Sequence, residues 1–546
     1  MSKISQYLNE HILGDISTDS AVRKYLSLDS SILAITPEIV AYPRITNDIR
    51  KIARFTYQLA IKGHAISITP RGMGTDRTGA AIGPGIIVNT TAHMNRIFEF
   101  DAKQRLVRVQ PGATLRSVND ALQLQGCYIP SFPENIMHST VGGAVANNAT
   151  GSLSGKYGAI EEYVEELEVV LANGDVLQTS RLNKRDLGKK KGLQTFEGDI
   201  YRAVDNLIGD NEKLIAETLG DGNMDNSGYA NIAKVKQKNG SFDLTPLFIG
   251  SQGTLGVISE MILRADFYNN EESALVAVVS DTQSLHDSID DLRKLDPDYL
   301  DVYSGELIAR TRLQGKRYAV CEEAAKRGAV AGLIICGFKD FNERARKKKL
   351  KKAEKNIEKF NATTFVAQDK DAMQEVKSLK GLLYASRQPL DRSDSSVISL
   401  LSGVYIPDDR FEDFSNSIAK LSKEHGVKLP MSGYALDGVY SYWPEYSLRT
   451  VAGKQRLLKL YDEFAKLVDS HNGTLVAESG EGRVKAPFAN KYADKDLLKV
   501  YEEIKNVFDP EGTLNTGVKQ QIDLREVVSH LHTGQDAARL AEYTAE

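Results

Sequence analysis

Three glycine-rich segments of this 546-residue chain could hold a phosphate-bearing ligand. The first, "ITPRGMGTDRTG" at residues 68–79, follows an alternating strand pattern. Glycines directly after a strand let backbone N–H groups turn toward an anion without side-chain obstruction. The segment is not a Walker loop, because no Gly-Lys-Ser/Thr follows it, and its GxGxxxxG spacing is not that of a dinucleotide fingerprint. Taken alone, it could also be a tight turn.

The second segment is "PENIMHSTVGGAVANNATGSLSGKYG" at residues 133–158, with no charged side chain between Glu134 and Lys156. Glycines and small residues at this density suit a backbone wrapped closely around an extended ligand. In the third segment, "GSQGTLGVISE" at residues 250–260, glycines interrupt an apolar strand. Three such segments in one chain are hard to explain as turns, so they predict an extended, phosphate-bearing ligand.

The bulk composition excludes several classes of protein. A net charge of -4 argues against a general nucleic-acid binder, which usually has a strongly basic face. Cys127, Cys321 and Cys336 are isolated, so neither structural disulfides nor an iron–sulfur cluster is expected. The first fifteen residues lack the apolar core of a signal peptide. We therefore expect a cytoplasmic protein of two or more domains.

Short helices and strands alternate through about residue 265, which predicts an α+β region. The apolar spacing predicts a helix over residues 46–63, with Thr46 as its N-cap and Gly63 as its stop. Asn173-Gly174 predicts a hairpin turn.

A charged insertion follows at residues 181–245, and helices are expected to predominate from about 270 to 475. The basic run Arg346–Lys352 is interpreted as a solvated helix face, with a membrane-surface patch as the alternative. The last residues, 527–546, are expected to form a surface helix.

The order of "RGMGT", "PENIMHSTVGGAVANNATG", "GSQGTLGVISE" and a terminal "FDPEGTLNTG" resembles the FAD-linked oxidoreductases of the vanillyl-alcohol oxidase and PCMH (p-cresol methylhydroxylase) type. Within them, the chain is most similar to the branch of D-lactate dehydrogenase, glycolate oxidase and D-2-hydroxyglutarate dehydrogenase. The resemblance implies an α+β flavoprotein with a two-subdomain FAD-binding domain and an α+β substrate (cap) domain. The implied parts are an N-terminal helical segment at 1–35, the FAD-binding domain at 36–268, the substrate domain at 269–475, a segment at 476–518 that returns to complete both sites, and a tail helix at 519–546.

The resemblance also implies how the FAD is held. Residues 70–76 would hold the pyrophosphate through backbone amides, and residues 139–151 would line the diphosphate and the isoalloxazine ring. Gly253 and Ile258 would lie near the adenine, and Asn515 would close the site. The full implied set is Pro70, Arg71, Gly72, Met73, Gly74, Thr75, Asp76, Pro133, Ser139, Thr140, Val141, Gly142, Gly143, Asn147, Asn148, Gly151, Tyr157, Gly253, Ile258 and Asn515.

Relatives that bond FAD covalently carry a histidine or cysteine in one of these loops. The first loop here has neither, so non-covalent FAD is expected. His138, beside the second loop, stays open between a loop histidine bonded to backbone and a covalent or catalytic residue.

On the substrate side, the family has a Trp-x-x-Arg whose guanidinium grips the substrate carboxylate. Here "LLYASRQPLDR" places Tyr384 and Arg387 at these two positions, with Arg392 as a second choice. Bidentate pairing of arginine with a carboxylate gives both affinity and orientation. A surface salt bridge is the alternative role of Arg387.

The family branch binds a divalent metal with two histidines of a Gly-His-x-x-Asp-Gly-Asn-x-His loop and the glutamate of a later Glu-His-Gly, whose histidine is the base. Here "GYALDGVYSYWP" has Tyr434 and Ser441 in place of the loop histidines, and Ser479 follows Glu478. Hydroxyls are poor ligands compared with imidazole, so no metal is expected. The base stays open among Tyr434, Glu478, Asp437 and Glu481. The implied catalytic set is Arg387, Tyr434, Glu478, Asp437 and Ser441, and the aromatic residues of the loop, including Trp443, are interpreted as a pocket wall.

These residues predict an FAD-linked dehydrogenase or oxidase that moves a hydride from a D-lactate-like 2-hydroxy acid to the flavin. Oxidation of an alditol, sugar or lactone is the alternative, and a flavin-retaining protein with a degenerate substrate site is a third interpretation. The expected partners are a small-molecule substrate and an unidentified electron acceptor: a quinone, an electron-transfer protein or oxygen. No nucleic acid and no transmembrane segment are expected, and peripheral membrane contact stays open.

Overall fold

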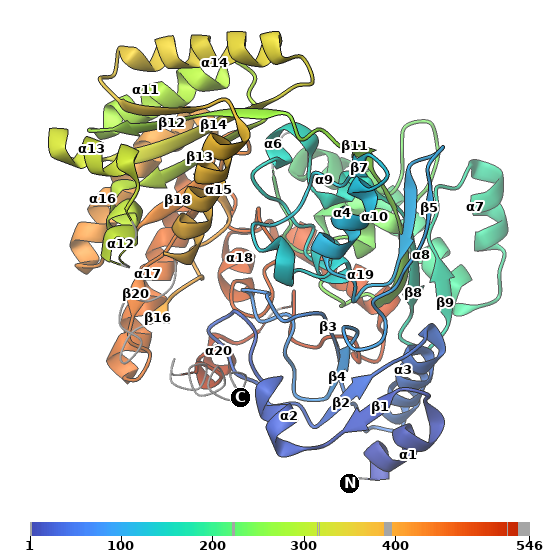
Figure 1. Ribbon diagram of the computed structural model, residues 1–546. Helices are drawn as coiled ribbons and strands as arrows, with labels where there is room; N and C mark the ends of the chain where they lie inside the picture. Colours follow the sequence, from blue (N-terminus) through green and yellow to red (C-terminus); the bar gives the residue numbers. More distant parts are fainter. Residues whose placement is uncertain are drawn as a thin grey trace. The chain divides into compact units, whose positions relative to one another are not determined.

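The computed structural model describes residues 3–220, 224–313, 315, 317–386, 396–520 and 522–532 (Figure 1). They divide into two compact units. Unit 1 takes Met1–Ala149, Ala159–Asp266 and Val476–His532, and unit 2 takes Thr150–Gly158 and Phe267–Leu475. The chain therefore leaves unit 1 twice and returns to it twice.

A four-stranded sheet forms the first layer of unit 1, in the order β1 (Asp15–Ser17), β2 (Ile39–Tyr42), β4 (Ile86–Asn89) and β3 (Ile68–Arg71). Helix α3 (Thr46–Ile61) packs its apolar stripe, including Ile49 and Ile52, against this sheet. Gly63 ends the helix at φ +83°, as predicted, but the prediction of Thr46 as N-cap is wrong. Ile45 precedes the first turn, and the Thr46 hydroxyl instead donates to Glu168 at 2.8 Å.

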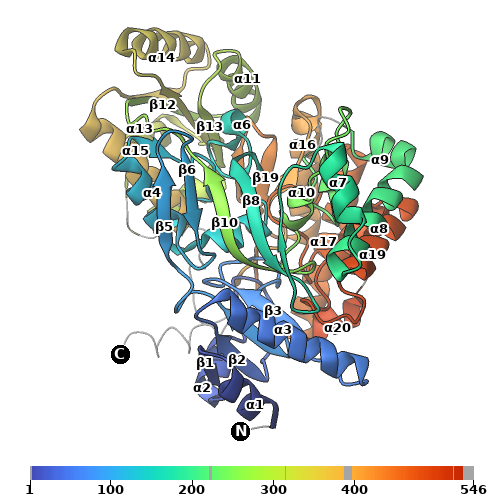
Figure 2. The same cartoon turned by 90° about the vertical axis from the view of Figure 1, so that its right-hand side faces the viewer.

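The second sheet of unit 1 has five antiparallel strands, and β10 lies between β6 and β8 (Figure 2). Its order is β5 (Ile97–Asp101), β6 (Leu106–Val109), β10 (Val257–Arg264), β8 (Val164–Val170) and β9 (Val176–Gln178). The β8–β9 hairpin turns at Gly174 with φ +83°, which confirms the predicted turn. Strand β10 also anchors the third glycine-rich segment, which precedes it directly in the chain.

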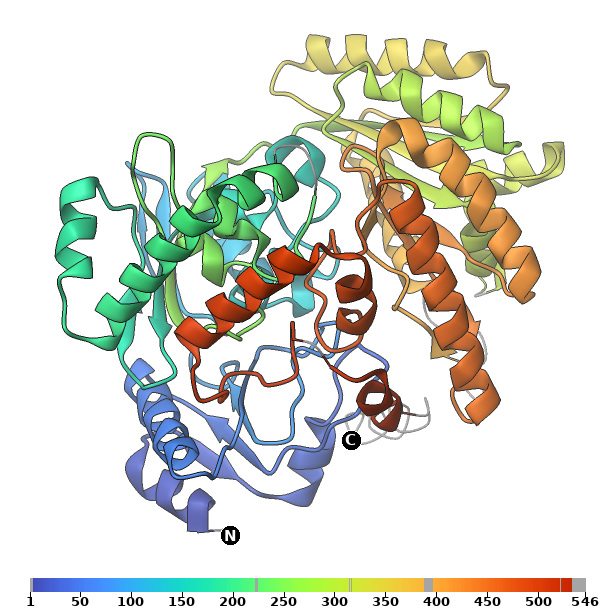
Figure 3. The same cartoon turned by 180° about the vertical axis from the view of Figure 1, so that it is seen from behind.

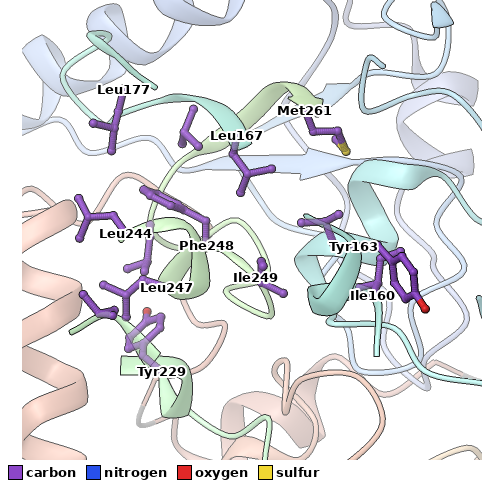
Figure 4. Packing of buried hydrophobic residues seen from close by; sticks show 14 of the residues in the cluster. Ile160, Tyr163, Leu167, Leu177, Tyr229, Leu244, Leu247, Phe248, Ile249 and Met261 are labelled. Carbon is purple, nitrogen blue, oxygen red and sulfur yellow. The ribbon is translucent and has the colours of Figure 1, made fainter. Parts of the chain in front are cut away.

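A large apolar cluster joins this sheet to helices α4 (Leu115–Gln123), α8 (Phe196–Asp210) and α19 (Lys495–Phe508). Figure 4 shows part of the cluster, where Leu167 and Met261 of the sheet lie near Phe248 and Ile249. The predicted charged insertion contains α7 (Lys184–Lys191), α8 and α9 (Glu212–Thr218), and it contributes Tyr201 and Phe242 to this core. The red helix α19 lies beside the green α8 (Figure 3). Phe508 of α19 meets Phe248 edge to face at 5.4 Å, so the C-terminal part of the chain completes the core of unit 1.

Unit 2 is built on a seven-stranded antiparallel sheet. Its order is β15 (Thr363–Ala367), β12 (Glu272–Val279), β14 (Gly332–Lys339), β13 (Tyr299–Ser304), β18 (Met431–Tyr434), β19 (Val439–Tyr442) and β17 (Val404–Tyr405). Helices still predominate over residues 270–475, as expected, but the sequence did not predict the sheet that they cover. Strands β12 and β14 are buried along almost their whole length, so they lack the alternating pattern that marks a half-exposed strand.

Helices cover both faces of this sheet (Figure 1). Helices α11 (Thr282–Arg293) and α14 (Glu343–Glu358) pack on one face, and α12 (Gly305–Leu313), α13 (Ala319–Arg327) and α15 (Lys370–Ala385) on the other. Helices α16 (Phe411–His425) and α17 (Val451–Ser470) pack on each other beside the β18–β19 hairpin.

The remaining elements are short. They are α1 (Lys3–His11), α2 (Ser20–Tyr25), β7 (Cys127–Tyr128), α5 (Val141–Ala146), α6 (Ser154–Tyr157), α10 (Thr245–Phe248), β11 (Asp266–Phe267), β16 (Ser396–Val397), β20 (Glu445–Tyr446), α18 (Ala486–Tyr492) and α20 (Leu524–Ser529). The segment at 1–35 is not purely helical, because β1 pairs with β2. Of the predicted tail helix, α20 is seen, and residues 533–546 lie outside the described part. None of the helices described is both long and apolar enough to span a bilayer.

Candidate active site

The first glycine-rich loop follows β3 and contains a row of backbone amides without an acceptor among the described residues. Among the described residues, no acceptor bonds the backbone N–H groups of residues 72–76. Gly74 has φ +75°, which only glycine adopts readily. Consecutive N–H groups of this kind form an anion-binding concavity.

The N-terminus of α5, in the second glycine-rich segment, lies against this loop. A Cβ atom on Gly72 would come within 2.2 Å of Thr140 Oγ1, so the close approach requires glycine. Thr140 also caps α5 by accepting from the amide of Gly143 at 3.2 Å. Two segments that were predicted to contact one cofactor therefore meet in unit 1.

Two members of the implied cofactor set play a different role. The amide of Val141 donates to Ala113 O at 2.8 Å, and its side chain is fully buried in the apolar cluster. The amide of Gly142 donates to Pro111 O at 2.9 Å. These two amides hold α5 in place and are not available to a phosphate, and any other contact of the two residues with the cofactor stays a prediction.

A buried hydrogen-bonded cluster, the cofactor hub, joins five side chains from four distant segments: Asp76, Thr78, Asn147, Gln252 and Asn515. Gln252 Nε2 donates to Thr78 Oγ1 at 3.0 Å and to Asn147 Oδ1 at 2.9 Å. Its Oε1 accepts from the Gly482 amide at 2.9 Å. Gln252 therefore links the first two loops to the C-terminal return segment.

Asn515 closes the hub from the C-terminal end of the chain. It is fully buried, and its Nδ2 donates to Gln252 O at 2.7 Å and to Ala80 O at 2.9 Å. Its Oδ1 accepts from Thr69 Oγ1 at 3.0 Å. The hub contains three residues of the implied set, Asp76, Asn147 and Asn515, in one network.

The sequence pattern did not single out Gln252 and Thr78 as site residues. Gln252 lies between glycines in "GSQGT", within the third glycine-rich segment, where the glycines drew attention and the glutamine side chain did not. In the structure Gln252 has φ +52°, a conformation that costs free energy for a non-glycine residue and is therefore fixed by its surroundings.

Charged groups surround the first loop. Arg71 is buried, and its guanidinium donates to Leu28 O at 2.8 Å and Ala81 O at 3.0 Å, so its side chain serves the fold. Burial, together with the charge of Asp76, raises the pKa of Asp29 to about 7. Burial lowers the pKa of Arg71, although Asp29 opposes that shift.

The C-terminal return segment places Glu478, Glu481 and Lys485 in unit 1. Glu481 is buried and bound: it accepts from Lys519 Nζ at 2.5 Å and from the Gly228 amide at 2.7 Å. Glu481 is therefore no longer a candidate base. Lys485 is buried, which lowers its pKa to about 8, while the nearby carboxylate of Glu478 opposes that shift.

Ser479, where the family has its last histidine, has φ +66°. Few non-glycine residues adopt this left-handed backbone conformation, and those that do are concentrated at functional sites. The backbone at this position is therefore held by its surroundings. Glu478, the residue before it, is half-buried.

Part of the second glycine-rich segment, Thr150–Gly158, belongs to unit 2. Ser152 Oγ donates to Asp301 Oδ1 at 2.7 Å, and Tyr157 Oη donates to Asp298 Oδ1 at 2.8 Å. The ammonium of Lys380 lies 2.6 Å from Asp301 Oδ2 and binds Ser152 Oγ at 3.0 Å. Tyr157, expected at the cofactor, thus anchors this segment to β13.

The hairpin β18–β19 carries the candidate substrate residues. It turns at Gly438 with φ +67°, and Tyr434 lies directly opposite Asp301 of β13. Opposite residues of an antiparallel pair share a sheet face. Ser441 Oγ accepts from the Gly403 amide at 2.9 Å. A Cβ on Gly155 would come within 2.5 Å of Asp437 Oδ1, so segment 150–158 abuts the turn.

The interpretation of the hairpin aromatics as a pocket wall is wrong for three of the four. Tyr440 is fully buried and stacks on Phe411 at 4.0 Å. Tyr442 meets Phe464 of α17 at 5.7 Å. Trp443 is buried, and its Nε1 donates to Ser432 Oγ at 2.9 Å. These rings form the core of unit 2, and Tyr434 is the remaining candidate.

Most other implied cofactor residues have structural partners. Ser139 Oγ donates to Asn135 Oδ1 at 2.8 Å, and Asn148 Nδ2 donates to Asn226 Oδ1 at 3.0 Å. The Gly151 amide donates to Ser154 Oγ at 2.8 Å. Gly253, at φ +73°, lies against Pro70 of β3.

The six remaining predicted residues lie in different parts of the chain. Ile258 packs on the core of unit 1, Pro133 is half-buried, and His138 is exposed. Tyr384 lies in the last turn of α15. Arg387 and Arg392 lie outside the described residues.

The geometry of unit 1 fits FAD. The free amides of residues 72–76, the glycine at 72 that lets two loops approach, and the hub behind them form a cradle for an extended diphosphate. Across the residues described, no three His, Cys, Asp or Glu side chains converge as metal ligands do.

Two families match the chain. The family described as "FAD binding domain" matches residues 37–180, and "FAD linked oxidases, C-terminal domain" matches residues 270–518. The chain belongs to the FAD-linked oxidases. FAD is accordingly its cofactor.

This FAD-linked oxidase is similar to several curated proteins. It is 27% identical over 532 residues to a D-2-hydroxyglutarate dehydrogenase of Pantoea ananatis, covering 92% of this chain and 50% of that one. It is 24% identical over 497 residues to the glycolate oxidase subunit GlcD of Bacillus subtilis, covering 90% and 91%. The chain spans about half the length of the D-2-hydroxyglutarate dehydrogenases that it matches.

Among solved structures, the FAD-linked oxidase is similar to p-cresol methylhydroxylase with substrate bound. The TM-score is 0.69 at 13% identity, covering 96% of this chain and 97% of that one. At this identity the likeness shows the fold, and it confirms the predicted PCMH-type α+β architecture.

Proposed function

We propose that this FAD-linked oxidase oxidises a D-lactate-like 2-hydroxy acid without a catalytic metal. The observation that carries the proposal is the hairpin of unit 2. It keeps its Asp437-Gly438 turn, with Tyr434 and Ser441 standing where the hydroxy-acid branch has histidines. The curated relatives named as dehydrogenases of 2-hydroxyglutarate and lactate support the substrate class.

Bound FAD would supply the acceptor for the hydride that leaves the carbon bearing the hydroxyl. The amides of residues 72–76 would hold its diphosphate, and the cofactor hub would fix the loops that surround it. Non-covalent attachment stays part of the proposal. The protein then has to hold the substrate carboxylate and take the hydroxyl proton.

Glu478 is our candidate for the base. It is half-buried beside the ammonium of Lys485, and a carboxylate accepts a proton at neutral pH better than a neutral phenol does. We assign the Tyr434 hydroxyl to orienting the substrate by a hydrogen bond, with Ser441 and Asp437 shaping the hairpin around it. Arg387 remains our choice for the carboxylate. Arg387→Met should raise the apparent KM for an acid sharply, and an unchanged KM would remove it from the site.

The test is anaerobic reduction of the flavin in the purified protein. D-lactate, L-lactate, glycolate, D-2-hydroxyglutarate and neutral polyols are added in turn, with and without EDTA, and bleaching of the oxidised flavin band is followed. Rapid bleaching by a D-hydroxy acid that ignores EDTA is the expected result. Bleaching that EDTA abolishes would overturn the metal-free assignment.

Oxidation of an alditol or sugar is the second candidate function. The hairpin face that carries Tyr434 also carries Ser432 and Ser441, and hydroxyls suit a neutral polyol. Bleaching by a polyol with no response to any acid would favour it. A flavin that only dithionite reduces would favour a degenerate substrate site. We also propose that the electrons pass to a quinone, an electron-transfer protein or oxygen, and that the protein is cytoplasmic.

A further inference from the structure

Helix α14 carries a row of cations that the proposed reaction does not use. Arg346, Leu350, Ala353 and Ile357 form its buried side. On the opposite side lies the basic stripe, which consists of Arg344, Lys348, Lys351, Lys352 and Lys355, all exposed. At 3.6 residues per turn these five fall within about 100° of arc and extend over about 17 Å.

The stripe is not neutralised by the protein. Nearby carboxylates already pair with cations outside the stripe: Glu271 with Arg346 at 2.9 Å, Glu343 with Lys347 at 2.6 Å, and Asp291 with Lys359. In the part of the chain that the structure describes, no carboxylate lies within ion-pairing distance of the five stripe residues.

Such a row works against the helix that carries it. Arg344 and Lys348, Lys348 and Lys352, and Lys351 and Lys355 are like charges four residues apart, which destabilises a helix. The chain as a whole has a net charge of -4, so general basicity does not explain the stripe.

We propose that the basic stripe docks this protein on an anionic lipid surface. Four of its five members are lysines, which are depleted in protein–protein interfaces but typical of segments that bind acidic lipids. Phe341, 69% exposed directly before the Asn342 N-cap, adds an apolar group that can enter the headgroup region. Helix α14 lies at an outer edge of unit 2 (Figure 1), where a flat surface can approach its exposed side.

The buried side of α14 decides the mode of attachment. Because its apolar residues pack on the sheet, the helix has no apolar face left to insert. The contact is therefore electrostatic and reversible, and it should weaken as salt is raised. A surface of this kind would bring the enzyme to an acceptor dissolved in the membrane.

The test is co-sedimentation of the flavin-loaded full chain with vesicles of phosphatidylcholine alone or with phosphatidylglycerol added. We expect binding only to the anionic vesicles, and release by salt. The triple variant K348Q/K351Q/K352Q should lower the partition coefficient about 100-fold, since each cation near the surface contributes about fivefold. Flavin content and Tm of the variant verify that it is folded.

The matched control is K213Q/K466Q/K495Q, which removes three exposed lysines of other helices. It should bind anionic vesicles within about twofold of the unaltered chain, because it removes the same number of charges and leaves the basic stripe intact. A chain that ignores anionic vesicles at low salt would overturn the proposal. The proposal would also be overturned if the control variant lost as much vesicle binding as the stripe variant. It would equally be overturned if duplex DNA bound the chain as well as the anionic vesicles do.

Discussion

The cofactor hub of unit 1 and the β18–β19 hairpin of unit 2 solve the problem of holding polar side chains differently. In the hub, side chains from positions as distant as Thr69 and Asn515 bond one another. In the hairpin, neighbouring strands fix the backbone, and rings such as Tyr440 fill the core behind it. A hub residue cannot change without leaving several partners unsatisfied, whereas a hairpin side chain can change while its frame stays. This difference accounts for a chain with intact cofactor loops and altered substrate residues.

The largest effect is expected from a substitution that separates the first two glycine-rich loops. Gly72→Val places atoms within 2.2 Å of Thr140 Oγ1, which forces the loops apart. We expect FAD affinity to fall more than about 1,000-fold, because the amides of residues 72–76 then miss the diphosphate. Flavin absorbance after gel filtration measures it. Gly209→Ala, in open space on α8, should keep its flavin, and a yellow Gly72→Val protein would refute the cradle.

Next in size is the hub itself. Asn515→Ala removes two donated hydrogen bonds and one accepted bond among buried groups. Each buried partner left unsatisfied costs about 1–3 kcal/mol, so unfolding free energy should fall by about 4 kcal/mol. Urea unfolding of the apoprotein gives the value. The control is Ser441→Ala, which removes a single hydrogen bond in the hairpin and should cost about 1 kcal/mol. If Asn515→Ala costs no more than this control, the hub tolerates substitution as well as the hairpin does.

Lys485 offers a pH-dependent comparison. Its folded pKa of about 8 lies below its value in the unfolded chain, near 10.4. Between these values the unfolded state binds more protons, so its contribution to stability rises with pH from about 8 to about 10. Lys485→Met should be more stable below pH 8, by at most about 3 kcal/mol, with the gap closing by about pH 10. The prediction is contradicted if the difference in unfolding free energy between the variant and the unaltered chain is the same at every pH.

At the hairpin, Tyr434→Phe should lower kcat about 100-fold for the best hydroxy acid if, as we propose, the Tyr434 hydroxyl bonds the reacting hydroxyl. FAD affinity and Tm should stay close to those of the unaltered chain. Stopped-flow flavin reduction separates the two effects. If the rate is unchanged, Tyr434 belongs to the core with its neighbours.

The smallest expected effect comes from Tyr440→Phe. The Tyr440 hydroxyl is buried, and no partner for it exists among the described residues. Removing an unsatisfied buried hydroxyl should raise stability by up to about 1 kcal/mol and leave flavin reduction unaltered. A large loss of rate would mean that the ring's hydroxyl acts in the reaction.

Sequence reasoning was strongest where local pattern and chemistry coincide. The glycine-rich loops were predicted with their residues, and Asp76, Asn147 and Asn515 meet in one network. The interlocking partner Gln252 was missed, because its role depends on contacts with Thr78 and Gly482, far away in the chain. Long-range pairing of this kind leaves no periodic trace in the sequence.

In unit 2, the same limit appears in two forms. Strands β12 and β14 are buried on both faces, so their apolar runs do not alternate and are easily taken for helix. Asp301 and Lys380 are single charges on a strand and a helix, and only the fold brings them within 2.6 Å. The aromatic cluster of the hairpin was recognised by type, but which side of the sheet each ring faces was decided by register.

The route of the chain through unit 1 has a consequence for biosynthesis. Asp76 and its loop leave the ribosome early, while Asn515 and the return segment arrive more than four hundred residues later. At about 5–20 residues per second, the first glycine-rich loop waits roughly 20–90 s for its last partner. The nascent protein therefore cannot complete its flavin cradle until the return segment at residues 476–518 has emerged, so the first loop cannot hold FAD fully before that point.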